Sequence, residues 1–514
     1  MKKFTLLIGG EDLDTGRYEY FPYVDKLIIS PKETFRIISD LKSGKDNINY
    51  KDSIYAKYCI GKDDTNRLAI NAAYKASREF KFFPLTRRKK ICYDINRLLR
   101  LYKKSLFELL VIEGHPPKLA EWEIRGMIIG GSKENIDFYS SYFLREIGRT
   151  KKETLLHLMR PDGVVCVCPP ANAPASNSYL SAFSFLAGNT LIIKPPLNNP
   201  LSTIYLWKNI ILEALNKNKA PKGTVNIVLG NSQLIMKEWL ASQYVNDILF
   251  FGDSKIGLEI GAKAFRAGKK PILELSGSDI MIIWKDADLN KAVESAMACF
   301  LGSAQICMVP KIILAHNDIY DTLINKIINE TKKIKFGLPS DPEVILTPVT
   351  RIQDFFRFMS DAIRKGAAVA YGGARVNYKG QKDEEGMYVQ PTILSITDNK
   401  ELPKMLCLKE EIFFPLLPIV KIFGKDDEIF NRISELVDVH QYGLRISVWV
   451  KSRSYIQKFI ERLSNSGLLR INLPHIGFST FLSTHGGTRR SGGPLGEMNY
   501  IWQKTSHLQG ISRS

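Results

Sequence analysis

The feature that most constrains the fold is a regular alternation of short apolar segments and longer amphipathic ones, from about residue 163 to residue 277. The short segments read GVVCVC, TLIIKP, TVNIVLG, DILFFG and ILEL, and the segments between them are long enough to form helices. This alternation is typical of a parallel, doubly wound sheet, in which helices cover both faces of apolar strands. The sequence therefore predicts an α/β protein.

A second α/β region follows, from about 277 to 480, with the strand-like segments DIMIIW, PKIILAH, LPIVKIF, ISVWV and GLLRIN. Residues 65–130 carry apolar side chains at helical spacing and predict helices. A chain of 514 residues is too long for one ordinary core, so we expect two or three domains. The last segment, from Thr488, is glycine-rich and then strand-like, which predicts a tail that packs on another surface, such as a second subunit.

Composition limits the class of protein. No stretch of eighteen consecutive apolar residues occurs, so we expect no membrane span. The seven cysteines are scattered without C-x-x-C spacing, which favours free thiols in a reducing compartment and gives no indication of a metal site. The apolar run at the N-terminus is too short for a signal peptide and ends at Gly9 and Gly10. We therefore predict a soluble, cytoplasmic protein.

The net charge of +19 raises the question of nucleic-acid binding. The basic residues are spread along the chain and are mostly lysine, and clusters such as Arg87 to Lys90 suit solvated helix faces. No nucleic-acid motif accompanies them. Charge alone concerns solubility and non-specific binding, so we expect no nucleic-acid partner.

Polar residues at the ends of the predicted strands are the candidates for function, because ligands of such sheets bind there. Asn172 lies between prolines in PANAP, where its amide could face a developing oxyanion or simply form a turn. Lys194 follows TLII, where it could bind a cofactor ribose or phosphate, or only keep its amine in water. Gly252 and Gly257 flank a strand-to-helix turn that could approach a pyrophosphate, although two glycines alone indicate this weakly.

Two further candidates carry reactive groups. Glu274 lies in the apolar strand ILEL, where a desolvated carboxylate becomes a usable base or an ion-paired structural group. Cys307 lies in GSAQICMVPK, with no charged residue nearer than Lys311 on its C-terminal side. A free cysteine is usually a buried core residue, and a nucleophilic one must be activated by its site. A base, an amide and a thiol together would make an acyl-transfer site.

The order of these segments resembles the aldehyde dehydrogenase superfamily. Its pattern runs P-W-N-F-P, G-N-T-x-x-x-K-P, F-T-G-S-x-x-x-G, L-E-L-G-G, G-Q-x-C and E-E-I-F-G-P. The chain has PANAP, GNTLIIKP, FFGDSKIG, LELSG, AQIC and EEIFFP in the same order, over nearly its whole length. The resemblance implies NAD(P)-dependent oxidation of an aldehyde to a carboxylic acid.

The resemblance also implies roles for individual residues. Cys307 would attack the aldehyde and carry a thiohemiacetal and then a thioester, Asn172 and the Cys307 N–H would form the oxyanion hole, and Glu274 would activate water. The residues that would contact NAD or NADP are Ala171, Lys194, Gly252, Asp253, Gly257, Leu275, Glu411 and Phe413. The implied organisation is a Rossmann-type cofactor domain (1–141 and 161–276), a catalytic α/β domain (277–488) and a β arm with the C-terminal tail (142–160 and 489–514). Such an arm implies a homodimer or homotetramer.

Departures from the family pattern leave alternatives open. Leu197 stands where many NAD-preferring members have a glutamate, which makes NADP plausible, and Asp253 puts an anion beside the expected phosphate. Ala171, Phe414 and His485 replace a tryptophan, a glycine and a phenylalanine. One alternative is a CoA-acylating dehydrogenase or acyl reductase, which would pass the thioester to CoA; Glu274 favours hydrolysis. Another is a non-catalytic family member, against which the intact Cys307 argues.

Overall fold

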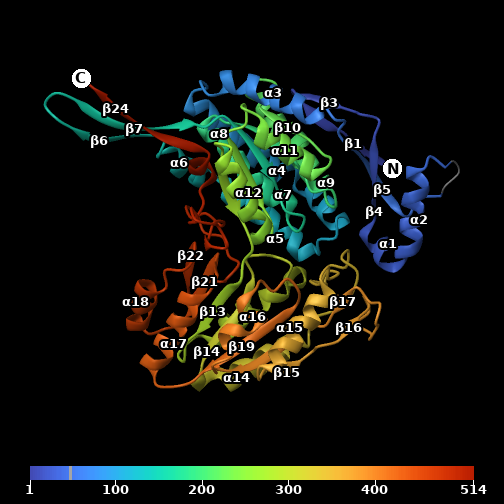
Figure 1. Cartoon of the computed structure of the whole chain (residues 1–514), viewed down its shortest axis with the longest axis vertical. Coiled ribbons are helices and arrows are strands. Elements are labelled where there is room, and N and C mark those ends of the chain that lie inside the picture. Colours follow the sequence, from blue (N-terminus) through green and yellow to red (C-terminus); the bar gives the residue numbers. More distant parts are fainter. Residues whose placement is uncertain (46–48) are drawn as a thin grey trace.

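The computed structural model describes residues 1–45 and 49–514. Two seven-stranded sheets form the upper and lower halves of the molecule in Figure 1. In order across the first sheet, the strands are β12 (Lys270–Glu274), β11 (Asp247–Phe251), β8 (Val164–Cys168), β9 (Thr190–Ile193), β10 (Val225–Ile227), β2 (Leu6–Ile8) and β3 (Glu11–Leu13). The first five are parallel, and β2 and β3 extend the sheet antiparallel.

Alternate residues of the parallel strands enter two different cores. Val164, Cys166 and Ile192 pack against one layer of helices, whereas Val165 and Leu191 pack against the other. The first layer contains α3 (Thr65–Phe80), α11 (Ser232–Ala241) and α12 (Ser254–Arg266). The second contains α4 (Leu85–Ile112), α5 (Pro117–Gly130), α6 (Lys133–Ser140), α7 (Pro174–Leu180), α8 (Ser184–Ala187), α9 (Leu201–Tyr205) and α10 (Leu212–Lys217). The predicted doubly wound arrangement is confirmed.

The second sheet has the order β15 (Ala368–Tyr371), β18 (Thr392–Thr397), β19 (Leu416–Ile422), β14 (Pro310–His316), β13 (Asp279–Ile283), β21 (Arg445–Trp449) and β22 (Leu468–Ile471). All neighbours are parallel except β15 and β18. Its helices are α13 (Leu289–Met297), α14 (Asn317–Thr331), α15 (Ile352–Arg364), α16 (Leu406–Lys409), α17 (Asp426–Val439) and α18 (Arg453–Arg462). Short pairs complete this half: β16 (Arg375–Val376) with β17 (Tyr388–Val389), and β20 (Tyr442–Gly443) with β23 (Thr488–Arg489).

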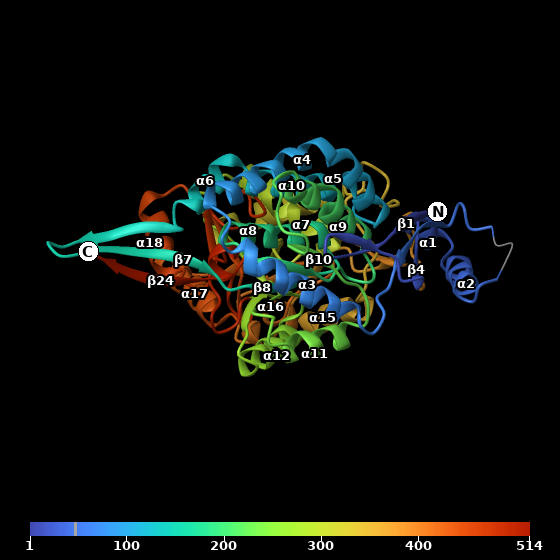
Figure 2. The same ribbon diagram turned by 90° about the horizontal axis from the view of Figure 1, so that it is seen from above.

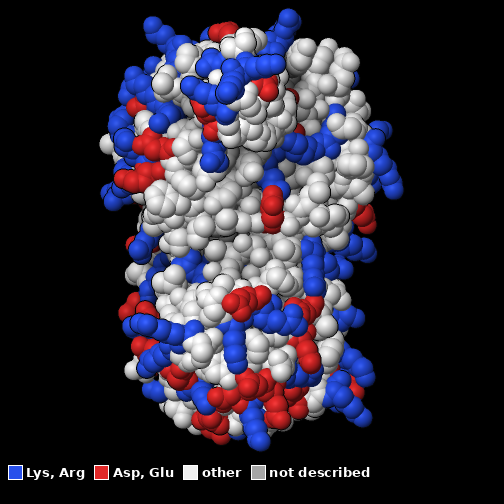
Figure 3. All heavy atoms as spheres, turned by 90° about the vertical axis from the view of Figure 1, so that its left-hand side faces the viewer, with Lys and Arg blue, Asp and Glu red and all other residues white. Residues whose placement is uncertain are grey.

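A three-stranded antiparallel arm projects from the body, as Figures 1 and 2 show. It consists of β6 (Leu144–Arg149), β7 (Thr154–Pro161) and the C-terminal β24 (Ser506–Arg513), which follows α19 (Ile501–Lys504). Opposite the arm, β1 (Lys2–Phe4), β5 (Ile54–Cys59) and β4 (Tyr18–Pro22) form a small sheet beside α1 (Val24–Ile29) and α2 (Pro31–Lys42). On the face that Figure 3 shows, lysine and arginine are interspersed with acidic side chains.

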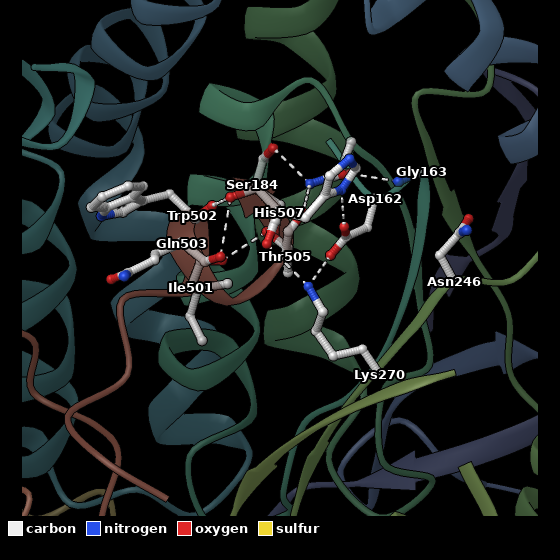
Figure 4. Close-up of polar contacts among 12 residues, drawn as sticks. Asp162, Gly163, Ser184, Asn246, Lys270, Ile501, Trp502, Gln503, Thr505 and His507 are labelled. Carbon is white, nitrogen blue, oxygen red and sulfur yellow. Dashed lines mark hydrogen bonds and ion pairs between the residues drawn. The ribbon is translucent and has the colours of Figure 1, made fainter. Parts of the chain in front are cut away.

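Polar contacts fix the root of the arm to the first sheet (Figure 4). Asp162, between β7 and β8, accepts hydrogen bonds from Lys270 and from Nδ1 of His507, the latter at 2.7 Å. Lys270 also donates to the Ser506 carbonyl at 3.0 Å. Because β24 begins at these residues, the C-terminal strand leaves the body in a fixed direction. Within the described residues, no helix has both the length and the apolar character needed to cross a membrane.

Candidate active site

Two cavities meet at Cys307, between the two halves of the molecule. The larger cavity, of about 620 Å³, lies at the carboxyl ends of β8, β11 and β12, and the smaller, of about 70 Å³, lies on the other side of the thiol. Five residues line both cavities: Asn172, Asn177, Ile306, Cys307 and His485. The junction of the two cavities is therefore where a group held in one can react with a group held in the other.

A strained left-handed turn presents Cys307. Gly302, Ser303 and Ala304 have φ values of 58°, 54° and 59°. Such a conformation costs about 1–2 kcal/mol for each residue that has a Cβ. Hydrogen bonds hold the turn: Ser303 Oγ donates to the Thr347 carbonyl at 2.7 Å, and the Gly302 N–H donates to the Ile345 carbonyl at 2.8 Å. These hydrogen bonds thus hold the strained backbone in one conformation just before the thiol.

Burial dominates the protonation of this thiol. It raises the pKa of Cys307 to about 12, and the nearby carboxyl groups of Glu411 and Asp279 act in the same direction, against Lys311. At neutral pH the group is a thiol in this state. Because the thiolate is the nucleophile, its formation needs a change in the charges that surround it.

Glu274 ends β12 and is buried, with 5% of its surface exposed. Its Oε2 accepts a hydrogen bond from the Gly486 N–H, and its Oε1 accepts one from Nδ2 of Asn499, both at 2.8 Å. Burial raises the pKa of Glu274 to about 7, and these two hydrogen bonds oppose the shift because they stabilise the carboxylate. A carboxyl group with this pKa is suited to general-base catalysis near neutral pH.

Replacing Asn499 with alanine is expected to move the pH dependence of activity upward. The carboxylate of Glu274 loses a donor, its pKa rises by about one unit, and the limb of the profile that rises through pH 7 shifts to higher pH. Steady-state kcat measured against pH in both proteins checks this. An unchanged midpoint in a folded variant would show that Asn499 does not control Glu274.

Asn172 lines both cavities at the start of α7. One hydrogen of its side-chain amide is donated to the Gln305 carbonyl at 2.8 Å, which leaves the other for a ligand oxygen. The Asn172 carbonyl contacts Nε2 of His115 at 2.8 Å, and the same nitrogen lies 3.4 Å from the buried carboxylate of Glu123. His115, which precedes α5, and Glu123 of α5 therefore help to fix the position of the Asn172 backbone.

The residues predicted to bind a cofactor divide into two groups. Those that line the larger cavity are Ala171, Gly252, Asp253, Leu275, Glu411 and Phe413. Lys194, at the end of β9, and Gly257, within α12, do not line it. Gly257 instead makes room for a neighbour, because a Cβ there would lie 2.1 Å from a methyl carbon of Leu275.

Asp253 is the N-cap of α12. Its Oδ1 accepts the backbone N–H groups of Lys255, at 2.8 Å, and Ile256, at 3.2 Å. The first N–H groups of this helix, which commonly bind phosphates, thus already have a carboxylate partner. A pyrophosphate bound here would have to tolerate or displace that carboxylate.

The other departures from the family pattern have distinct environments. Phe414 is in the hydrophobic core beside the second sheet, with its ring edge-to-face against Phe358 at 5.2 Å between centroids, and does not line either cavity. His485 lines both cavities, and burial lowers its pKa to about 3, so its ring is neutral. Leu197 is partly buried, and its carbonyl accepts the Tyr58 hydroxyl at 2.8 Å.

The structure also places residues at the site that the motifs did not indicate. Val24 of α1 and Arg351 line the larger cavity, and the Arg351 guanidinium lies 5.8 Å from the centre of the Phe413 ring. Asn499 and His115 support Glu274 and Asn172 from distant parts of the chain. A short motif cannot reveal such contacts, because they join segments far apart in sequence.

The smaller cavity has apolar and aromatic walls that include Trp122, Phe183, Phe478 and Met308. Of the described residues that line it, one is acidic, Glu123, and none is lysine or arginine. Its small volume and its lack of a cation restrict what can bind beside the thiol.

The larger cavity fits a nicotinamide dinucleotide. Its volume is in the range of cofactor sites. Phe413 offers an aromatic ring for stacking, and the Glu411 carboxylate, which accepts the Gly277 N–H at 3.0 Å, can also accept a ribose hydroxyl.

Comparison with known proteins agrees with this geometry. The model of the aldehyde dehydrogenase family matches residues 45–510. A lactaldehyde dehydrogenase from Methanocaldococcus jannaschii is 29% identical over 452 residues, which cover 86% of this chain and 91% of the relative. The mitochondrial succinate-semialdehyde dehydrogenase of Arabidopsis thaliana is also 29% identical, over 95% of this chain and 84% of its own.

Solved structures of aldehyde dehydrogenases are similar to this chain over nearly its whole length. The glyceraldehyde-3-phosphate dehydrogenase GapN of M. jannaschii, complexed with NADP, superposes with a TM-score of 0.77 and 27% identity, over 90% of this chain and 96% of its own. An aldehyde dehydrogenase from Brucella melitensis, 22% identical, has the same fold with a TM-score of 0.82 over 99% of this chain and 97% of its own. The chain belongs to the aldehyde dehydrogenase family, and its activity is the NAD(P)-dependent oxidation of an aldehyde.

Proposed function

We propose that the protein oxidises a small, uncharged aldehyde to its carboxylic acid and releases the product by hydrolysis. The observation that supports this most is the placement of a buried base, Glu274, in the same cavity as the thiol of Cys307. A CoA-dependent release would not need that base. The organisation that goes with this proposal is a cofactor domain (1–141, 161–276), a catalytic domain (277–488) and an arm (142–160, 489–514).

The residues act in sequence on the substrate carbon. The thiol of Cys307 gives its proton to water, and the thiolate sulfur forms a bond to the aldehyde carbon while the C=O π electrons move to the oxygen. The free amide hydrogen of Asn172, with the Cys307 N–H, stabilises the resulting oxyanion. A nicotinamide cofactor, when bound, would accept the hydride that leaves the former aldehyde carbon as the oxyanion re-forms a carbonyl, so that a thioester remains on Cys307. The carboxylate of Glu274 then takes a proton from water, whose oxygen attacks the thioester and expels the thiolate. The residues that would hold the cofactor are those that line the larger cavity: Ala171, Gly252, Asp253, Leu275, Glu411 and Phe413. Lys194 and Gly257, which do not line it, stay predictions from the resemblance alone.

Either NAD or NADP could serve as the cofactor. Leu197 provides no carboxylate to repel a 2′-phosphate, and Asp253 keeps a carboxylate at the N-terminus of α12. The GapN structure to which the chain is similar contains NADP. The lack of a carboxylate at Leu197 and the NADP in the similar GapN structure favour NADP, whereas the Asp253 carboxylate does not distinguish the two cofactors.

The charge of the smaller cavity supports the choice of an uncharged substrate. A carboxylate or phosphate placed there would lose its hydration and gain no cation, which is costly. The names of the relatives include lactaldehyde, which is small and uncharged, and succinate semialdehyde, which is anionic. We propose that the substrate of this chain is small and uncharged, as lactaldehyde is.

A matched pair of four-carbon aldehydes tests this proposal. With NADP, and then with NAD, kcat/KM for butanal is expected to exceed that for succinate semialdehyde by at least ~10-fold, because only the latter brings a carboxylate into the cavity. Turnover is expected to be the same with and without CoA. Preference for the anionic aldehyde, or dependence on CoA, would overturn the respective part of the proposal.

We further propose that the protein is a homodimer, alone or as half of a tetramer. A groove of about 1160 Å³ lies beside the arm, between α12, the edge strand β12 and the C-terminal segment. Phe265, Leu495 and Leu508 line it with 73%, 65% and 54% of their surfaces exposed. On the same side of the molecule, the middle of the surface is mostly white, with few charged side chains (Figure 3). A second copy would cover these apolar groups.

Replacing Phe265 with glutamate is expected to shift the protein toward the monomer of 58.2 kDa, because the carboxylate would be buried in the interface. Light scattering after size-exclusion chromatography measures the mass. Phe82→Glu is the matched control, since Phe82 is 75% exposed and lies outside the groove. Equal masses for both variants would contradict this interface.

A further inference from the structure

Helix α1 lies at the height where the two halves of the molecule meet (Figure 1). It follows β4, whose small sheet packs on the core of the first half through Phe21, Tyr55 and Tyr58. The N–H of Tyr23, directly before α1, donates a hydrogen bond to the carbonyl of Ser53 at 3.0 Å. The start of the helix is therefore fixed to the small sheet and, through that sheet, to the first half.

Other side chains of α1 contact the second half. Ile28 has 8% of its surface exposed and belongs to the same hydrophobic core as Val344. The hydroxyl of Ser340 donates a hydrogen bond to the carboxylate of Asp25. Both partners in the second half belong to the segment 332–351, which joins α14 to α15. The helix α1 thus connects the first half with a loop of the second half.

Val24 is the point where this connection reaches the larger cavity. Its side chain packs against a hydrophobic core of each half and lines the cavity. A Cβ at Gly114 would lie 3.2 Å from Cγ1 of Val24, so α1 lies directly against the turn between α4 and α5, which also lines the cavity. The second half lines the same cavity with Thr347 and Arg351, from the loop that α1 contacts. The helix α1 therefore bridges two walls of the cavity.

We propose that α1 is a clasp that holds these two walls together around the bound cofactor and slows its release. This inference rests on the proposed function, which assigns the larger cavity to NAD or NADP. A cofactor that binds between two halves has to order both of them, and walls that are already connected reduce this cost. Because the connection stabilises the bound state, its loss is expected to appear mainly as faster dissociation.

Ile28→Ala and Ile29→Ala form a matched pair of variants. The two isoleucines are neighbours on α1, but Ile28 is buried against the second half, whereas 47% of the surface of Ile29 is exposed. Stopped-flow fluorescence of NADPH, displaced by excess NADP, gives the dissociation rate constant of each protein. We expect Ile28→Ala to release NADPH about tenfold faster than the wild type, with association within about twofold, and Ile29→Ala to match the wild type. Equal dissociation rates for the two variants would overturn the proposal.

A role of α1 confined to stability would leave the dissociation rate of the folded protein unchanged. If Ile28→Ala does not fold, Asp25→Ala decides, because it removes the hydrogen bond to Ser340 at the surface and should speed release about threefold. An unchanged rate in that variant would overturn the proposal. Glu411→Ala distinguishes the two levels of failure. If Glu411→Ala weakens NADPH binding and the α1 variants do not, only this inference fails; if none of them changes binding, the assignment of the cavity to the cofactor fails as well.

Discussion

Replacing Cys307 with alanine is expected to lower kcat/KM for aldehyde oxidation by at least ~10³-fold, because Cys307 alone carries a thiol among the described residues that line both cavities. Cofactor affinity is expected to stay within about twofold of the wild type, since the change removes a sulfur atom and no donor from the larger cavity. Reduced-nicotinamide absorbance with butanal measures the activity, and calorimetry measures the affinity.

Cys299→Ala is the matched control for this variant. Cys299 is in the same segment, is also a free thiol, and is buried in a hydrophobic core beside the second sheet with 2% of its surface exposed. Its replacement is expected to cost stability and leave kcat/KM near the wild-type value. If Cys299→Ala were as inactive as Cys307→Ala, the assignment of the nucleophile would be wrong.

Glu274→Gln is expected to separate the two halves of the reaction. Formation of the thioester does not need the base, so each subunit should reduce one cofactor rapidly, whereas steady-state turnover should fall by ~10²–10⁴-fold because water is no longer activated. Stopped-flow absorbance resolves the burst from the steady state. In the wild type, hydrolysis should increase as pH rises through 7, where the carboxyl group of Glu274 loses its proton.

An added nucleophile gives the control for this prediction. Hydroxylamine attacks thioesters without a general base, so it should restore turnover of Glu274→Gln and have little effect on Cys307→Ala. Loss of the burst in Glu274→Gln would contradict a role confined to hydrolysis. Steady-state turnover equal to that of the wild type would exclude Glu274 as the base.

The sequence predicted the fold well because the α/β pattern is local. Apolar runs such as GVVCVC and DILFFG are the central strands β8 and β11, and SHLQGIS closes the arm as part of β24. Strands buried on both faces must be apolar along their whole length, so their composition alone indicates a sheet covered by helices. The order of the strands within each sheet, with β2 and β3 added from the N-terminus, depends on contacts between distant segments. The sequence did not indicate it, and it is known only from the structure.

The candidate site was only partly predictable for the same reason. Cys307, Glu274 and Asn172 belong to short motifs at the ends of turns or strands; each motif alone was ambiguous, and the order of the motifs along the chain indicated their roles. Asn499 contacts Glu274 from a segment far away in the sequence, and such a contact leaves no pattern in the sequence. Gly257 was expected to approach a phosphate, but the structure gives it a packing role against Leu275.

The most direct test of the central claim is mass spectrometry of Glu274→Gln, quenched within its first turnover with butanal and NADP. The account predicts an acyl group of four carbons on the peptide that contains Cys307, at about one per subunit, with Cys299 of the same peptide unmodified. Cofactor reduction without an acyl group on Cys307, or an acyl group on another residue, would contradict the account.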